Sequence, residues 1–180
     1  MERFEHIGAK QHNSMYRLSV DLNISNCPWC PNFKKVYSES ELSPQGLCLL
    51  AFHAIYPYYL TLTNGGWFRW VKPKDGVIVQ CPNPKGALEM KVFLNNSDNT
   101  VRIEILQARG NCPKGHKKGD VFVLRPDTFK FCPKALGAFI PYLYLLEKGG
   151  KLPWIDKNGR PNLICPHVDC GNAKFTVEEG

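Results

Sequence analysis

The chain lacks an apolar segment of transmembrane length. Its longest apolar stretch, residues 136–146, is interrupted by Pro141, whereas a membrane-spanning helix needs about 20 apolar residues. Residues 1–6 also lack the apolar run typical of a signal peptide. These two absences predict a cytoplasmic protein that has no membrane as a partner.

The basic residues form no dense cluster. Lys and Arg number 23 against 16 Asp and Glu, which gives a net charge of +7. The densest groups are only Lys34-Lys35 and Lys117-Lys118. A positive charge favours nucleic acid or an anionic ligand as a partner, but such even spacing is more typical of an ordinary basic surface. We therefore expect nucleic acid to be an unlikely partner.

The chain has eight cysteines but no sign of the oxidising compartment in which disulfides persist. In a reducing compartment, cysteines more often bind metal or do chemistry. The even count leaves a secreted, disulfide-bonded protein open as an alternative. With 43% hydrophobic residues, the chain can bury a core without disulfides.

Apolar and polar residues alternate in several short segments, which predicts strands. The expected strands span residues 16–24, 33–37, 77–81, 87–93, 101–105, 121–124, 163–166 and 173–177. We expect one helix to begin at Ser43-Pro44 and another to be capped by Asp127, because a hydroxyl or carboxylate caps a helix and proline suits its first turn. Pro57 and Pro141 should kink or end these helices.

The two halves of the chain repeat each other. Identical residues recur at an offset of 84, and they include rare types: Cys48/Cys132, Ala51/Ala135, Pro57/Pro141, Gly65/Gly149, Gly66/Gly150, Trp70/Trp154, Cys81/Cys165 and Pro82/Pro166. At an offset of 85, Asn26-Cys27-Pro28 matches Asn111-Cys112-Pro113. We interpret the chain as a tandem duplication.

The expected fold class is α+β, with two tandem β-β-α-β-β repeats packed as a pseudo-dimer. Residues 1–14 would be a flexible arm, 15–94 the first repeat and 100–180 the second, with the polar turn 95–99 between them. Each repeat would form a four-stranded antiparallel sheet with a helix on one face, and the two units would bury their remaining apolar surface against each other. The protein would be a monomer of this kind or a homodimer.

Each repeat offers four soft metal ligands: Cys27, Cys30, Cys48 and Cys81 in the first, and Cys112, His116, Cys132 and Cys165 in the second. Four is the number that a tetrahedral zinc ion or an iron–sulfur cluster needs. Zinc is the first expectation and an iron–sulfur cluster the alternative. Packing of these cysteines in the core is an alternative to metal binding, since cysteine is a small apolar side chain.

Other functions stay open. The protein could be an enzyme that acts on a small molecule through Cys112, His116, Asp120 or Cys132, with Asp120 orienting the imidazole. Trp70 and Trp154, with Tyr58 and Tyr142, could line a pocket for a small-molecule ligand or simply pack over the helix ends. A zinc-dependent nucleic-acid-binding module is the remaining alternative.

Several of these motifs resemble a family of short prokaryotic proteins that have no settled activity. The shared motifs are Cys-Pro-x-Gly-His-x-x-Gly-Asp at residues 112–120, Pro-x-Gly-Leu-Cys-x-x-Ala at residues 44–51, then Gly-Gly, a Trp and a final Cys-Pro. Members of that family are about one repeat long, so the resemblance covers residues 16–178 as a duplication. It implies a small cytosolic protein and supplies no substrate.

Overall fold

The computed structural model describes residues 16–20, 36–72, 75–166 and 173–179. In this part of the chain the fold is α+β, with two four-stranded antiparallel sheets and three α-helices. The strands are β1 (Tyr16–Val20), β2 (Val36–Ser38), β3 (Val77–Gln80), β4 (Leu88–Asn95), β5 (Thr100–Ala108), β6 (Val121–Leu124), β7 (Asn162–Ile164) and β8 (Lys174–Glu179). The helices are α1 (Glu39–Leu42), α2 (Leu49–Thr63) and α3 (Pro133–Glu147), with short 3-10 turns η2 (Pro44–Gly46) and η3 (Pro126–Thr128). The expected arm at residues 1–14 lies outside the described residues.

The sheets do not follow the two halves of the chain. One sheet has the strand order β2-β1-β8-β7 and the other β3-β4-β5-β6. Each sheet therefore joins two strands that end by residue 95 to two strands that begin at or after residue 100. The expectation that each half would form its own four-stranded sheet is wrong, because β1 pairs with β8 and β4 pairs with β5.

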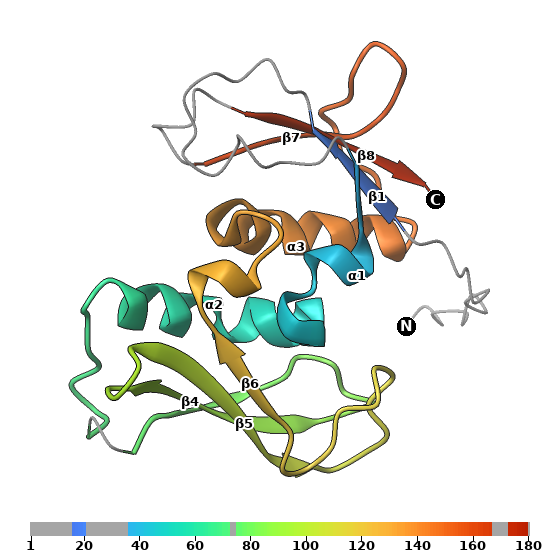
Figure 1. The fold of residues 1–180 in the computed structure, drawn as a ribbon. Coiled ribbons are helices and arrows are strands. Elements are labelled where there is room, and N and C mark those ends of the chain that lie inside the picture. Colours follow the sequence, from blue (N-terminus) through green and yellow to red (C-terminus); the bar gives the residue numbers. More distant parts are fainter. Residues whose placement is uncertain (1–15, 21–35, 73–74, 167–172, 180) are drawn as a thin grey trace.

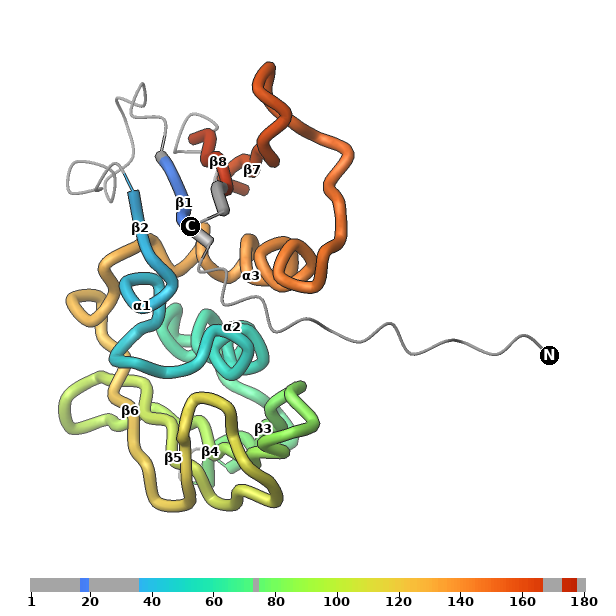
Figure 2. The backbone as a smooth tube through the Cα atoms, turned by 90° about the vertical axis from the view of Figure 1, so that its right-hand side faces the viewer, coloured from blue at the N-terminus to red at the C-terminus, as the bar shows by residue number. Residues whose placement is uncertain are grey.

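The two long helices lie between the two sheets (Figures 1 and 2). Helix α2 packs on β3, β4 and β5, and also contacts α3. Helix α3 packs on the other sheet, where the ring centroids of Phe139 and Phe175 are 4.9 Å apart. Phe131, just before α3, contacts both Tyr37 of β2 and Phe175 of β8. Aromatic side chains therefore hold α3 against strands from both ends of the chain.

Both long helices begin later than the sequence predicts. The residue Gln45 has φ 51°, a left-handed conformation that stops a helix from starting at Pro44. Helix α2 begins only after Cys48, and α3 begins after Cys132 rather than at Asp127. Pro57 and Pro141 do not end these helices but lie inside them. An internal proline costs about 3 kcal/mol, and burial of both helices between the sheets offsets that cost.

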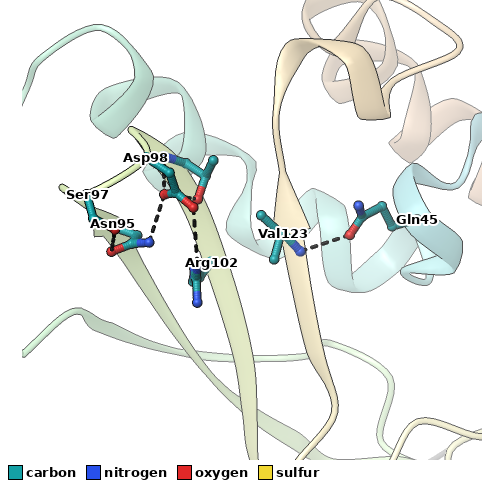
Figure 3. Close-up of polar contacts among 7 residues, drawn as sticks. Gln45, Asn95, Ser97, Asp98, Arg102 and Val123 are labelled. Atoms are coloured by element: carbon teal, nitrogen blue, oxygen red, sulfur yellow. Dashed lines mark hydrogen bonds and ion pairs between the residues drawn. The ribbon is translucent and has the colours of Figure 1, made fainter.

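The turn between β4 and β5 is closed by the side chain of Asp98 (Figure 3). Its carboxylate accepts hydrogen bonds from Asn95 Nδ2 at 2.7 Å and from Thr100 Oγ1 at 2.7 Å, and it pairs with Arg102 at 3.1 Å. The expected boundary at residues 95–99 is thus a hairpin turn within one sheet.

A side-chain contact fastens η2 to the neighbouring sheet. Gln45 Oε1 accepts a hydrogen bond from the backbone N–H of Val123 at 2.9 Å, on the edge strand β6 (Figure 3). The chain that leads into α2 is therefore held beside β5 and β6. None of the helices in the described part of the chain is long and apolar enough to cross a membrane.

Candidate Cys/His site

Three cysteines and one histidine converge near the start of α2. Cys48 precedes α2, Cys81 follows β3, and Cys112 and His116 lie in the loop between β5 and β6. The backbone N–H of Cys48 donates a hydrogen bond to Nε2 of His116 at 3.1 Å. The thiols of Cys48 and Cys112 both act electrostatically on Cys81. We refer to these four residues as the Cys/His site.

The turn at Pro44–Gly46 delivers Cys48 to this site. Gln45 and Gly46 have positive φ angles of 51° and 78°, which reverse the chain before α2. The Gln45 contact with β6 holds the turn against the sheet. Cys48 then becomes the N-cap residue of α2, and its carbonyl accepts the hydrogen bond from Phe52 N–H at 2.8 Å.

Close packing of two backbone segments brings Cys81 and Cys112 together. Cys81 extends the β3–β4 ladder by donating its N–H to the carbonyl of Leu88 at 2.9 Å. The following turn places Gly86 against Cys112, where a Cβ on Gly86 would lie 3.2 Å from both Cα and Cβ of Cys112. This distance is tighter than ordinary van der Waals contact, so glycine is the residue that fits.

His116 lies half-buried, edge-on to the ring of Phe122, with the ring centroids 5.2 Å apart. Burial lowers the pKa of His116, the nearby carboxylate of Asp120 opposes this shift, and Lys114 adds to it. The imidazole is therefore neutral at neutral pH, which is the form that binds metal ions. The Asp120 carboxylate accepts a hydrogen bond from the backbone N–H of Lys117 at 2.9 Å, so its direct partner is the turn and not the imidazole.

The local charges disfavour a free thiolate at Cys81. Burial raises the pKa of Cys81, and negative charge on Cys48 or Cys112 raises it further, while a hydrogen bond from the Asn83 backbone lowers it. Lys114 is a cation in the β5–β6 loop. It forms a salt bridge with Glu39 of α1 at 2.6 Å. This pairing raises the pKa of Lys114, and negative charge on Cys48 adds to the rise.

Cys132 and Cys165 form a second group beside α3. Both are buried, and each occupies the place in the chain that Cys48 or Cys81 has in the first group: Cys132 is the N-cap of α3, and Cys165 follows β7. Cys165 N–H donates to the carbonyl of Ala173 at 2.8 Å. Burial raises the pKa of Tyr56, and negative charge on Cys132 and on Cys165 adds to this shift. The predicted ligands Cys27 and Cys30 lie outside the described residues.

The predicted ligands therefore meet across the two halves of the chain. Cys112 and His116 lie with Cys48 and Cys81, not with Cys132 and Cys165 as the grouping by repeat implied. Over the described ranges, no three or more His, Cys, Asp or Glu side chains are arranged as a ready metal-ligand set. The four side chains of the Cys/His site are neighbours, but they are not positioned as they would be around an ion.

The two tryptophans after the helices are exposed and contact aromatic neighbours, and a ligand pocket at these rings stays a prediction. Trp70 is 75% exposed and Trp154 is 47% exposed. Trp154 contacts Tyr142 edge-on, with ring centroids 5.7 Å apart, and Trp70 contacts Phe68 at 5.2 Å. Both rings therefore present a face to solvent.

Sequence reasoning missed the residues that support the site. These are Gln45, which holds the turn before α2, Gly86, which packs against Cys112, and Lys114, which pairs with Glu39. The positive φ that Gly46 permits was the one local signal for a turn before α2. The other contacts join residues that lie far apart in the sequence. No protein-family model, no curated protein and no solved structure matches this chain.

Proposed function

We propose that this protein binds a zinc ion through Cys48, Cys81, Cys112 and His116. What supports the proposal is the convergence of three thiols and one imidazole from separate segments at the start of α2. Three cysteines and one histidine are an established ligand set of structural zinc sites. Zinc bound there would tie β3, α2 and the β5–β6 loop together, and this would stabilise the fold.

The electrostatics of the site favour a cation. Burial and the two neighbouring thiols make a thiolate at Cys81 unfavourable, and a divalent ion removes this penalty because it stabilises all three thiolates at once. His116 is already neutral, so no proton has to leave the imidazole before it binds. The donor chemistry thus fits zinc better than it fits an isolated reactive thiol.

One contact has to change when the ion binds. The Nε2 atom of His116 accepts the Cys48 N–H at 3.1 Å, so its lone pair is in use. Ligation requires that His116 leaves this hydrogen bond, because either Nε2 binds the ion itself or the tautomer that frees the Nδ1 lone pair carries its proton on Nε2. Zinc binding therefore involves a local rearrangement of the β5–β6 loop, in agreement with the absence of a ready ligand set in the described residues.

We also propose that the chain is a duplicated unit whose halves exchange hairpins. Replacing β1–β4 by β5–β8 converts the strand order β2-β1-β8-β7 into β6-β5-β4-β3, the order of the other sheet read backwards. The identical residues at an offset of 84 support the same correspondence. In this arrangement Cys132 and Cys165 are the counterparts of Cys48 and Cys81. The role of Cys27 and Cys30 as ligands stays a prediction from the sequence, as does a cytoplasmic location.

Catalysis by thiols is the weaker alternative. A nucleophilic cysteine needs a lowered pKa or an adjacent base. Burial raises the pKa of Cys81, and the His116 Nε2 that would act as a base is occupied by the Cys48 backbone. An iron–sulfur cluster is distinguished from zinc by colour, because only the cluster absorbs visible light.

The test is metal content and cobalt substitution of anaerobically purified full-length protein. We expect bound zinc, a colourless protein, and a thiolate-to-metal charge-transfer band when Co²⁺ replaces zinc. The substitutions Cys48→Ser, Cys81→Ser and Cys112→Ser each weaken that band and lower zinc affinity.

A histidine pair provides the matched control. His116→Gln lowers zinc affinity, while His53→Gln, which changes a histidine on α2 outside the site, leaves it unchanged. A folded, metal-free protein that takes up neither Zn²⁺ nor Co²⁺ at neutral pH contradicts the proposal. A brown protein that contains iron and sulfide contradicts zinc binding and supports an iron–sulfur cluster at this site instead.

A further inference from the structure

The segment that follows α2 presents an exposed aromatic ring on an ordered turn. The indole N–H of Trp67 donates to the carbonyl of Val71 at 2.8 Å, and Val71 N–H donates to the carbonyl of Phe68 at 3.1 Å. Phe68 packs between Tyr58 of α2 and Trp70, with ring centroids 5.3 and 5.2 Å apart. Trp70 is supported from one side and is 75% exposed.

This exposure requires an explanation. Moving an indole out of water is favourable, and its larger apolar surface gives it a greater free energy of burial than leucine. The chain nevertheless keeps the ring of Trp70 in solvent on a turn closed by hydrogen bonds. An aromatic ring held in this way is pre-organised for a flat partner, since little conformational freedom is lost on binding.

The two charged residues of the turn 64–72 are both basic. Arg69 and Lys72 are exposed on either side of Trp70, and no acidic residue occurs between Asn64 and Lys72. The nearest one in sequence is Asp75, whose N–H donates to the carbonyl of Lys72 at 2.9 Å. The whole chain carries +7. The partner should therefore combine a flat aromatic face with negative charge.

We propose that this turn, residues 64–72, is a binding site for single-stranded nucleic acid, with a base stacked on Trp70 and phosphates paired with Arg69 and Lys72. Nucleotides are the common biological ligands that carry an aromatic face and a phosphate within one repeating unit. Proteins that bind single strands combine basic surface with exposed aromatic rings in this manner. The sequence places Trp70 between Arg69 and Lys72, and the structure adds that all three side chains are exposed.

A single strand is favoured over a duplex. The bases of a duplex are stacked on each other, so their faces are not available to an indole, and reaching them requires unstacking. The turn also lies at the outer edge of the molecule, after the end of α2 (Figure 1), where an extended strand can approach it. The turn lies at the opposite end of α2 from Cys48, and the proposed binding does not depend on bound metal.

The test is fluorescence anisotropy with the full-length protein at low salt. The labelled probes are 20-nucleotide single strands of RNA and of DNA with mixed sequence, together with the corresponding duplex. Trp70→Ala should weaken single-strand binding about 5- to 150-fold, the range for loss of one stacked base, while Trp70→Phe retains most of it. The double substitution Arg69→Gln, Lys72→Gln should reduce the slope of log affinity against log salt by about 0.7 for each cation that contacts a phosphate.

Ile155→Ala is the control, because Ile155 is a 55% exposed apolar residue without a ring for stacking. It should leave binding unchanged. Circular dichroism melting checks that the exposed substitution at Trp70 leaves the fold intact. Absence of saturable binding to any single strand overturns the proposal. So does a Trp70→Ala protein that binds like the unchanged chain, or binding to duplex as tight as binding to single strand.

Discussion

The contact between the two long helices depends on a glycine that leaves room for an aromatic ring. Gly137 lies on the buried face of α3, where a Cβ would lie 2.5 Å from Cε1 and 2.6 Å from Cδ1 of Tyr56 on α2. Carbon atoms in favourable contact are about 3.5–4.0 Å apart. We therefore predict that Gly137→Ala forces Tyr56 or the helix to move by about 1 Å.

Two opposing effects set the size of the change. In a helix interior, alanine is favoured over glycine by about 1 kcal/mol. Inserting a methyl group into a packed interface costs about 1–3 kcal/mol. Tyr56 has limited freedom to yield, because its ring also contacts that of the buried residue Phe52, with centroids 5.8 Å apart. We expect a net destabilisation of about 0–2 kcal/mol, opposite in sign to the effect of helix propensity alone.

A double-mutant cycle separates the two effects. The free energy of unfolding is measured by urea titration for the unchanged chain, Gly137→Ala, Tyr56→Ala and the double variant, all in one buffer. When Tyr56 is truncated, the clash disappears and Gly137→Ala should stabilise the protein by about 1 kcal/mol. The coupling energy between the two positions should then be about 1–3 kcal/mol.

The same cycle shows which result would contradict the predicted contact between Gly137 and Tyr56. If Gly137→Ala stabilises the unchanged chain by the full propensity difference and shows no coupling to Tyr56, then α2 and α3 do not pack through this contact. In that case the arrangement of the two helices between the sheets needs revision. Equal urea dependence in all four proteins is required for the comparison, since a changed slope signals an altered unfolding transition.

Two further predictions concern the site and the core. Burial lowers the pKa of His116 in the folded protein from its usual 6.5, so the unfolded chain protonates this imidazole more readily. The contribution of His116 to the free energy of unfolding is therefore fully present above about pH 6.5 and is lost as the pH falls through the lower pKa of the folded state. The free energy of unfolding of His116→Asn, measured without metal from pH 7.5 to 4.5, should vary less with pH than that of His53→Asn, and parallel curves would contradict this. Phe131→Ala removes a ring that is 2% exposed and should cost about 3–5 kcal/mol in urea titration, whereas a loss below about 1 kcal/mol would show that its packing on Phe175 contributes little.

Local patterns predicted the elements well where side chains alternate. The strand expected at residues 121–124 matches β6, and those expected at 77–81 and 87–93 agree with β3 and β4 within two residues. The helix starts were wrong because Ser43 and Asp127 have the chemistry of caps, while the backbone at Gln45 and the 3-10 turn at Pro126–Thr128 prevent a helix there. Cap chemistry is a local signal, and backbone conformation before a helix depends on what the turn contacts.

For the candidate site too, the sequence supplied the local signals, and the tertiary contacts decided the arrangement. The sequence identified Cys48, Cys81, Cys112 and His116 as candidates from residue type, spacing and repetition. It grouped them by repeat, and that grouping was wrong, because local patterns do not determine which strands pair between distant parts of the chain. Pairing of β4 with β5 and of β1 with β8 decided this. The strand pairing that joins the two halves of the chain in each sheet also brings cysteines from both halves together.

By itself, the sequence determined the α+β class, the strand positions, the internal correspondence at an offset of 84 and the residue types available for chemistry. These follow from local periodicity and composition, which do not depend on distant contacts. The tertiary structure alone decided that Cys112 and His116 join Cys48 and Cys81, and that Gly137 admits Tyr56. Each of these depends on segments far apart in the chain, and their placement is set by how the hairpins pair and the helices pack.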